Sequence, residues 1–152
     1  MARDSKLSRR PWPLAGAAAC LLFLAGMLLG GCKEQEAARG AALYTVHCAA
    51  CHGANGQGQN PARPWGSLAP EQEGWIAPAL DMRGHCYVHP RKQLFSLIRD
   101  GSPFPGTTMV GFKAKLSDEQ IRWIVSYLES LWDRRTRKEY EDREKLYTPK
   151  PR

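Results

Sequence analysis

The sequence predicts an all-α fold that consists of a few helices and one long loop. Two stretches carry this prediction. After Ser117, apolar residues recur as far as Trp132 at the spacing of one helical face. After Pro90, Leu94 and Ile98 repeat that pattern over a shorter stretch. No internal repeat is visible, and a chain of 152 residues allows one domain with tails.

The charge of the chain is too mild to indicate a nucleic-acid partner. The formal net charge is +7, but residues 1–31 contribute four basic residues and one acidic residue. The remainder carries 18 basic against 14 acidic residues, which leaves +4. Aromatic residues are not interleaved with a basic stripe either. We therefore expect no binding of nucleic acid.

Residues 1–31 have the organisation of an export signal. A basic start is followed by sixteen uncharged residues, 14–29, and then by the run Leu29-Gly30-Gly31-Cys32. That ending resembles the lipobox of bacterial lipoproteins, in which the cysteine is lipidated and becomes the first mature residue. An uncleaved membrane anchor is the alternative, but sixteen residues are short against the ~20 that span a bilayer.

The lipobox predicts where the domain resides. We expect residues 1–31 to be removed and Cys32 to carry the lipid, so that the domain is tethered to a membrane on its periplasmic side. Residues 32–37 would then be a short polar tether. Because Lys33 rather than an aspartate follows the cysteine, the resemblance to lipoproteins implies the outer membrane in preference to the inner one.

The run Cys48-Ala49-Ala50-Cys51-His52 has the pattern C-x-x-C-H, which attaches a c-type haem. Two thiols add to the two vinyl groups of a haem, and the two intervening residues give the sulfur atoms a spacing that the vinyl groups can meet. The histidine that follows is then placed under the iron as its proximal ligand. The sequence therefore predicts one covalently bound haem c on Cys48 and Cys51, with His52 as an iron ligand.

Three alternatives compete with the haem site. A thioredoxin-like redox pair needs a βαβ context, which the sequence does not show. A structural zinc site needs a second pair of ligands, and Cys86 with His85 or His89 is the one candidate. Coincidence is the third alternative. Haem is favoured because the rest of the chain supplies the surroundings that a haem needs.

We expect a helix from about Ala37 to Ala50. Gly40 and Tyr44 share one face of it, because they stand four residues apart. A small residue one turn before an aromatic residue lets a second helix approach closely and pack on the ring. An ordinary helix glycine would cost about 1 kcal/mol relative to alanine. We favour the packing role because a partner helix begins after Ser117.

Residues 53–80 form the long loop, since they are rich in Gly, Pro and Asn. Loops of this length in compact domains are usually functional, and wrapping a cofactor is a sufficient reason for this one. We expect Pro78-Ala79-Leu80 to lie behind His52. A backbone carbonyl there would accept the hydrogen of the imidazole Nδ1 and fix the orientation of the ring.

The last two helices frame a second loop. One helix begins at Pro90 and ends at Asp100-Gly101. The other begins at a capping box, Ser117-Asp118-Glu119-Gln120. Between them, residues 102–112 hold Met109 in a loop that two prolines stiffen.

Together these pieces resemble the class I cytochromes c, the small mono-haem type of bacterial respiratory chains. The resemblance covers residues 38–132, and its pieces are the haem motif with Gly53, Gly40 with Tyr44, Pro78 with Leu80, the run Pro105-Gly106-Thr107-Thr108-Met109, and the helix after Ser117. In that family the first and last helices cross at a glycine–aromatic contact, which residues 40, 44 and 124–128 would form here. The methionine of the family usually precedes Pro-Ala-Phe, whereas Val110-Gly111-Phe112 lacks the proline.

The resemblance implies a cytochrome c-like domain over residues 38–132, with its helices wrapped around one covalently attached haem. It implies one-electron transfer with redox protein partners, such as an oxidase, a reductase or a dehydrogenase. Two axial ligands leave no iron site for a substrate, so we expect an electron carrier and not an enzyme. Residues 133–152 are mostly charged, and we expect this tail to be solvated, partly frayed and outside the core.

The sixth iron ligand has several candidates. Met109 is favoured, because a thioether binds iron weakly and a preformed loop lowers the cost of holding it in place. Met82 lies nearer the loop behind His52 and has no such frame. The other candidates are His85, His89 and Cys86. We expect these histidines to be surface or loop residues and the cysteine to be a small buried hydrophobe.

Two alternatives to an electron carrier are left open by the sequence. A haem-based sensor or a peroxidase-like protein would need a vacant or displaceable sixth iron site. A structural lipoprotein would hold no haem. The visible spectrum with and without carbon monoxide separates the first alternative from a carrier, and a haem stain tests the second.

Overall fold

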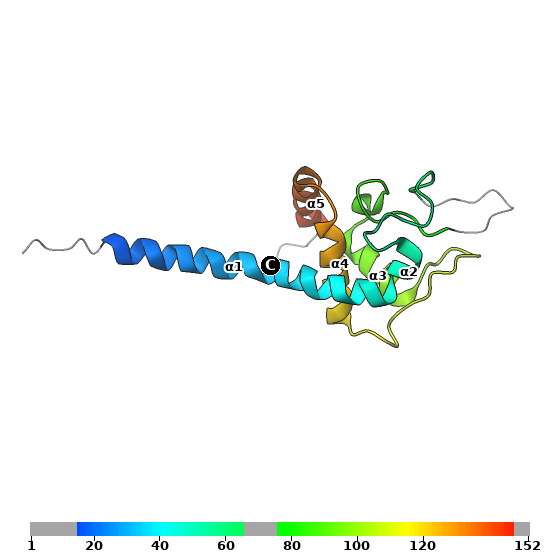
Figure 1. Cartoon of the computed structure of the whole chain (residues 1–152), viewed down its shortest axis with the longest axis horizontal. Coiled ribbons are helices and arrows are strands. Elements are labelled where there is room, and N and C mark those ends of the chain that lie inside the picture. Colours follow the sequence, from blue (N-terminus) through cyan, green and yellow to red (C-terminus); the bar gives the residue numbers. More distant parts are fainter. Residues whose placement is uncertain (1–14, 66–75, 148–152) are drawn as a thin grey trace, which may run out of the picture. The chain divides into compact units, whose positions relative to one another are not determined.

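The computed structural model describes residues 15–65 and 76–147, and it describes the side chains from residue 31 onward. The chain divides into two units, Met1–Cys32 and Lys33–Arg152. The helical elements are α1 (Ala15–His47), α2 (Ala49–His52), the 3-10 turn η1 (Cys86–Val88), α3 (Arg91–Asp100), α4 (Asp118–Ser130) and α5 (Arg134–Tyr147) (Figure 1). No strand occurs among the described residues, so the prediction of an all-α fold is confirmed.

Helix α1 differs from the helix that we predicted over residues 37–50. It includes residues 33–37, which we had expected to be a tether, because this stretch consists of strong helix formers such as Lys, Glu, Gln and Ala. It ends at His47, because Cys48 has φ −121° and ψ −34° and so leaves helical geometry. Over the part of the chain described with side chains, no helix is long and apolar enough to cross a membrane.

The predicted glycine contact between the first and last helices of the domain is present. A Cβ atom on Gly40 would lie 1.9 Å from the carbonyl oxygen of Trp123 and 2.9 Å from the Cβ of Tyr127. Tyr44 is fully buried, and its ring centroid lies 4.9 Å from that of Tyr127. Helices α1 and α4 therefore touch backbone to backbone at the glycine, where the cyan part of α1 crosses α4 in Figure 1.

The capping box at the start of α4 is formed as predicted. The Ser117 hydroxyl accepts a hydrogen bond from the Gln120 amide over 3.2 Å, and the Gln120 side chain accepts one from the Ser117 amide over 2.9 Å. The helix then buries one apolar face, which consists of Ile121, Ile124, Val125 and Leu128. Leu94 and Ile98 of α3 pack into the same core.

We predicted that residues 133–152 lie outside the core, and this is wrong for residues 134–147, while residues 148–152 lie outside the described residues. After α4 ends, the chain turns and forms α5, which packs against η1. Tyr140 of α5 is 1% exposed, and its ring centroid lies 4.9 Å from that of Trp132. The Arg143 guanidinium donates a hydrogen bond to the carbonyl oxygen of Tyr87. We had placed this segment outside the core because most of its residues are charged. A single aromatic ring nevertheless buries enough apolar surface to attach an otherwise polar helix.

Replacing Tyr140 with alanine is therefore expected to lower the free energy of unfolding by about 3–5 kcal/mol, as for other buried aromatic rings. Its hydroxyl is buried without a hydrogen-bond partner in the described part of the chain, so Tyr140→Phe should be neutral or stabilising. Tyr147, in the same helix and 63% exposed, is the matched control. Denaturant unfolding measures all three variants. Equal midpoints for Tyr140→Ala and Tyr147→Ala would contradict this role of α5.

Candidate functional site

The candidate site is built around His52, the last residue of α2. Its side chain is buried, at 9% exposure, and its Nδ1 lies 2.9 Å from the carbonyl oxygen of Pro78. A carbonyl oxygen can only accept, so Nδ1 carries the hydrogen and Nε2 carries the free lone pair of the neutral ring. Burial lowers the pKa of His52, although the bond to Pro78 acts in the opposite direction. The ring is therefore neutral near pH 7, which is the form that binds a metal.

The two thiols of the motif lie on the turn that precedes His52. The amides of Cys51 and His52 both point to the carbonyl oxygen of Cys48, over 3.1 Å and 2.9 Å. Neither cysteine is in a disulfide; Cys48 is half-buried against the core and Cys51 is exposed. Burial, followed by the proximity of Cys51, raises the pKa of Cys48 to about 11. Neither sulfur atom is therefore committed to a disulfide bond.

Backbone contacts hold the loop behind His52. The Gly58 amide donates to the His52 carbonyl oxygen over 2.8 Å, and the Leu80 amide donates to the Gly56 carbonyl oxygen over 2.7 Å. Gly58 has φ +78°, and a Cβ atom there would lie 2.6 Å from the amide nitrogen of Ala79. A glycine is required at this approach. The two sides of the loop thus pack directly on each other, which fixes the carbonyl group that His52 uses.

Two buried side chains attach this loop to the helices. The Tyr44 hydroxyl donates to the carbonyl oxygen of Gly53 over 2.7 Å. The Trp132 indole donates to the carbonyl oxygen of Leu80 over 3.0 Å. Desolvation raises the pKa of Tyr44 well above its usual value, so its hydroxyl keeps its proton and remains a donor. The sequence placed both rings on helix faces and gave no sign of these two hydrogen bonds.

Met109 lies in a loop whose backbone is attached to the end of α3. Its side chain is half-buried against the core, and its carbonyl oxygen accepts a hydrogen bond from the Ser102 amide over 3.2 Å. Gly101 and Val110 form an isolated antiparallel bridge. A Cβ atom on Gly101, which has φ +90°, would lie 3.0 Å from the Met109 carbonyl oxygen. The loop is therefore held at its base, on both sides of the methionine.

The other candidate ligands have different surroundings. Met82 is at the surface, with 36% of its area exposed. The rings of His85 and His89 lie edge to face, with their centroids 5.1 Å apart. The centroids of the Trp65 and His85 rings are 5.3 Å apart. Cys86 is buried in the core, as predicted. Within the described residues, no three His, Cys, Asp or Glu side chains lie together as a metal site.

The residues present fit a c-type haem. Two unpaired thiols stand on one turn, followed directly by a neutral imidazole whose Nε2 is its free nitrogen. The second nitrogen of that imidazole is fixed by a backbone carbonyl, as is usual for metal-binding histidines. The chain can therefore attach the macrocycle through sulfur and orient an axial ligand toward its iron.

Comparison with known proteins points the same way. Residues 35–128 match the family model of cytochrome C oxidase, cbb3-type, subunit III. The dihydro-heme d1 dehydrogenase of Pseudomonas aeruginosa is 34% identical to this chain over 103 residues, which are 68% of the chain. The chain spans only 17% of the length of that relative. No solved structure matches the chain.

Proposed function

We propose, from the premise that the chain belongs to the cytochrome c family of cbb3-type subunit III domains, that it carries one haem c and passes single electrons between redox proteins. The haem supplies an iron that cycles between two oxidation states. The observation that carries this proposal is the contact of His52 Nδ1 with the Pro78 carbonyl oxygen, 2.9 Å long, directly after two unpaired thiols. That contact prepares an imidazole to bind iron.

In this proposal Cys48 and Cys51 hold the haem by thioether bonds, and His52 and Met109 are the axial ligands. Pro78 orients the imidazole through its carbonyl oxygen, and Leu80 of the same loop is the remaining cofactor-binding residue. The half-buried side chain of Met109 and the bonds at the base of its loop support its role. With both axial positions filled, the iron has no site for a substrate, which is the arrangement of a carrier rather than a catalyst.

We further propose that residues 1–31 are removed and that Cys32 is lipidated, so that the domain is tethered on the periplasmic side, at the outer membrane. The lipobox-like run Leu29-Gly30-Gly31-Cys32 supports this step. The helix supports it as well, because cleavage before Cys32 would place Glu34 and Glu36 in the first turn of the mature helix. Carboxylates at that end complement the helix dipole.

The redox partners are then proteins of the same compartment, such as an oxidase, a reductase or a dehydrogenase. The Pseudomonas aeruginosa relative is named as a dehydrogenase. Because this chain spans only 17% of that relative, we propose the electron-carrying step alone for it and not the dehydrogenation.

Attachment of the haem is tested by denaturation. The unsubstituted protein is expected to keep its haem stain after denaturing electrophoresis, and its intact mass should exceed that of the acylated mature polypeptide by the mass of one haem. The double variant Cys48→Ala with Cys51→Ala should lose the stain. Cys86→Ala, which removes a buried thiol outside the motif, is the control and should keep it. A haem that leaves the unsubstituted protein on denaturation would contradict covalent attachment.

Lipidation is tested at Cys32. Cys32→Ala is expected to release the protein into the soluble fraction or to leave residues 1–31 attached. Stable anchoring needs more than one acyl chain, so the N-terminal peptide of the unsubstituted protein should carry several. Cys20→Ala, within the apolar part of the signal, should be processed normally. An intact Met1 in the membrane-bound protein would favour the uncleaved anchor instead.

A further inference from the structure

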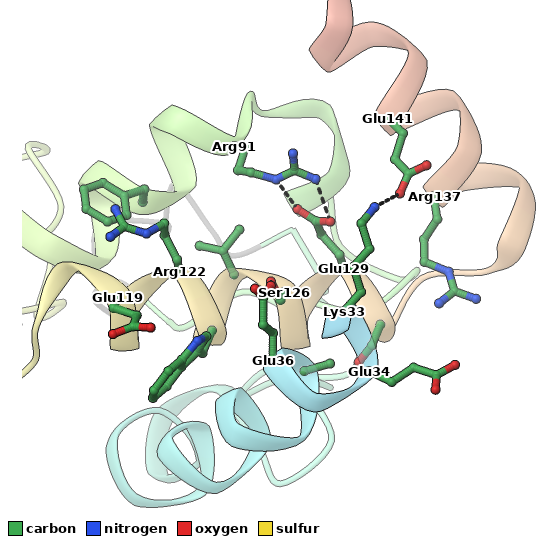
Figure 2. Close-up of a pocket in the computed structure, with 15 residues that line it drawn as sticks. Lys33, Glu34, Glu36, Arg91, Glu119, Arg122, Ser126, Glu129, Arg137 and Glu141 are labelled. Atoms are coloured by element: carbon green, nitrogen blue, oxygen red, sulfur yellow. Dashed lines mark hydrogen bonds and ion pairs between the residues drawn. The ribbon is translucent and has the colours of Figure 1, made fainter. Parts of the chain in front are cut away.

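The first residues after Cys32 are attached to the domain rather than forming a free tether. Lys33 Nζ donates to Glu141 of α5 over 2.6 Å, and the Ser126 hydroxyl of α4 donates to Glu36 over 3.2 Å. Figure 2 shows Lys33 reaching from α1 to Glu141 of α5. The segment that directly follows the lipidation site is thus helical and in contact with two other helices.

The next turn of α1 makes these contacts rigid. The Arg39 guanidinium lies 4.9 Å from the centre of the Trp123 ring, and Gly40 touches the α4 backbone. An exposed ion pair such as Lys33–Glu141 contributes only about 0–1 kcal/mol, so it would not hold the segment alone. The backbone contact at Gly40 cannot open unless α1 and α4 separate. It therefore fixes residues 33–40 of α1 to the domain.

Helix α1 then runs without interruption to the haem motif. From Lys33 to Cys48 there are fifteen residue steps, which correspond to about 22 Å at the rise of an α-helix. A helix holds this length, whereas a flexible chain would not. The attachment point of the lipid and the thiols of the haem site are therefore separated by one rigid element.

The surface beside Lys33 carries charges of both signs. A pocket of about 540 Å³ opens there between α1, α3, α4 and α5. Four charged side chains of its lining make no ion pair within the described residues, and they are Glu34, Glu119, Arg122 and Arg137. Two carboxylates and two guanidinium groups complement the amine and phosphate groups of phospholipid head groups.

We infer that the domain stands on the membrane in one orientation. The surface around this pocket, from Lys33 to Arg122 and Arg137, contacts the phospholipid head groups, and the haem site is held at one height above them. This inference rests on the proposed lipidation of Cys32. The lipid brings the head-group layer to Cys32, the first residue after the proposed cleavage, and no flexible linker lies between that residue and the packed domain. The domain then presents its haem to partners in the same membrane at a fixed distance and does not swing on a tether.

The decisive variant inserts eight Gly/Ser residues between Cys32 and Lys33. Such a linker has a root-mean-square length of about 16 Å, which lets the domain tumble. The same insertion between Tyr147 and Thr148, at the end of α5, is the matched control. Each protein is reconstituted into oriented bilayers of phosphatidylethanolamine and phosphatidylglycerol. Linear dichroism of the haem absorption and polarised infrared absorption of the amide I band then measure the orientation of the domain.

We expect dichroism in both bands for the unsubstituted protein and for the control, and loss of it for the Cys32–Lys33 insertion. The haem content and the solution spectrum should be the same in all three. Equal dichroism in all three proteins would overturn the inference. Mass spectrometry of the N-terminal peptide shows whether the fixed orientation alone is wrong or the proposed lipidation is wrong as well. Acylated but isotropic unsubstituted protein overturns the fixed orientation alone, whereas an unmodified Cys32 overturns the proposed lipidation as well.

The head-group contact has its own test in the same bilayers. The double variant Arg122→Glu with Arg137→Glu would turn the charged lining entirely acidic at these four positions, so it is expected to lower the dichroism without changing acylation. Lys113→Glu and Lys115→Glu, in the exposed segment before α4, are the matched charge reversals and should leave it unchanged. Equal dichroism of the two double variants would overturn the contact with head groups.

Discussion

Replacing Met109 with alanine is expected to open the sixth position of the iron and to lower its reduction potential. A methionine ligand raises the potential of a haem relative to a second nitrogen ligand. Axial ligands set haem potentials over a range of ~0.8 V, so we expect a fall on the order of 0.1 V or more. A redox-titrated visible spectrum measures it. The weak far-red band that class I cytochromes c show when oxidised should disappear, and carbon monoxide should begin to bind.

The same substitution should leave the rest of the site intact. The proposed thioether bonds of Cys48 and Cys51 would not depend on the loop, and His52 is oriented from the other loop, by Pro78. The loss of packing and of one weak bond should lower the free energy of unfolding by a few kcal/mol at most. The haem stain and the proximal ligation are therefore expected to survive.

Met82→Ala is the matched control for this experiment. It removes a thioether at an exposed position, so the far-red band and the potential should be unchanged. If Met82→Ala abolishes the band and Met109→Ala does not, the ligand assignment is wrong. Binding of carbon monoxide by the unsubstituted protein would favour the sensor or peroxidase-like alternative, because it requires a displaceable sixth ligand.

The features that the sequence predicted well are each signalled by a short run of residues. The capping box at Ser117 needs two side chains three residues apart, and both of its hydrogen bonds are formed. The contact at Gly40 follows from a missing side chain one turn before Tyr44. The hydrogen bond from His52 to Pro78 also appears in the stretch where we expected a carbonyl group behind the ring. In each case a short run of residues signals the contact, even where the partner lies far along the chain, as Pro78 does from His52.

The features that the sequence did not show depend on residues far apart in the chain. The indole of Trp132 binds the carbonyl of Leu80, 52 residues away, and only the folded core brings them together. Helix α5 attaches through Tyr140, whose effect is hidden by the charges on either side of it. Residues 33–37 of α1 are a similar case, because they are polar in composition and yet contact α4 and α5. Whether these segments pack on the domain depends on the contacts of single residues and not on the average polarity of the segment.

Gly40→Ala is expected to be among the most damaging single substitutions in the domain. The added Cβ would lie 1.9 Å from the carbonyl oxygen of Trp123 and 2.5 Å from its carbon, and both are backbone atoms that no rotamer change can move. Helix α1 must therefore shift away from α4. That shift also strains the contact of Tyr44 with Tyr127 and its hydrogen bond to Gly53.

Two opposing terms set the size of the effect. Alanine favours a helix by about 1 kcal/mol over glycine, whereas overpacking of a close contact costs about 1–3 kcal/mol and occasionally more. Because the added atom meets backbone atoms, we expect a cost above that range, about 3–4 kcal/mol, and hence a net loss of about 2–3 kcal/mol in the free energy of unfolding of the haem-loaded protein, measured in denaturant. Ala42→Gly, at an exposed position of the same helix, is the control and should lose about 1 kcal/mol through propensity alone. If Gly40→Ala instead raises the unfolding midpoint, the two helices do not cross at this glycine. The inference that residues 33–40 of α1 are held rigidly on α4 would then be wrong as well.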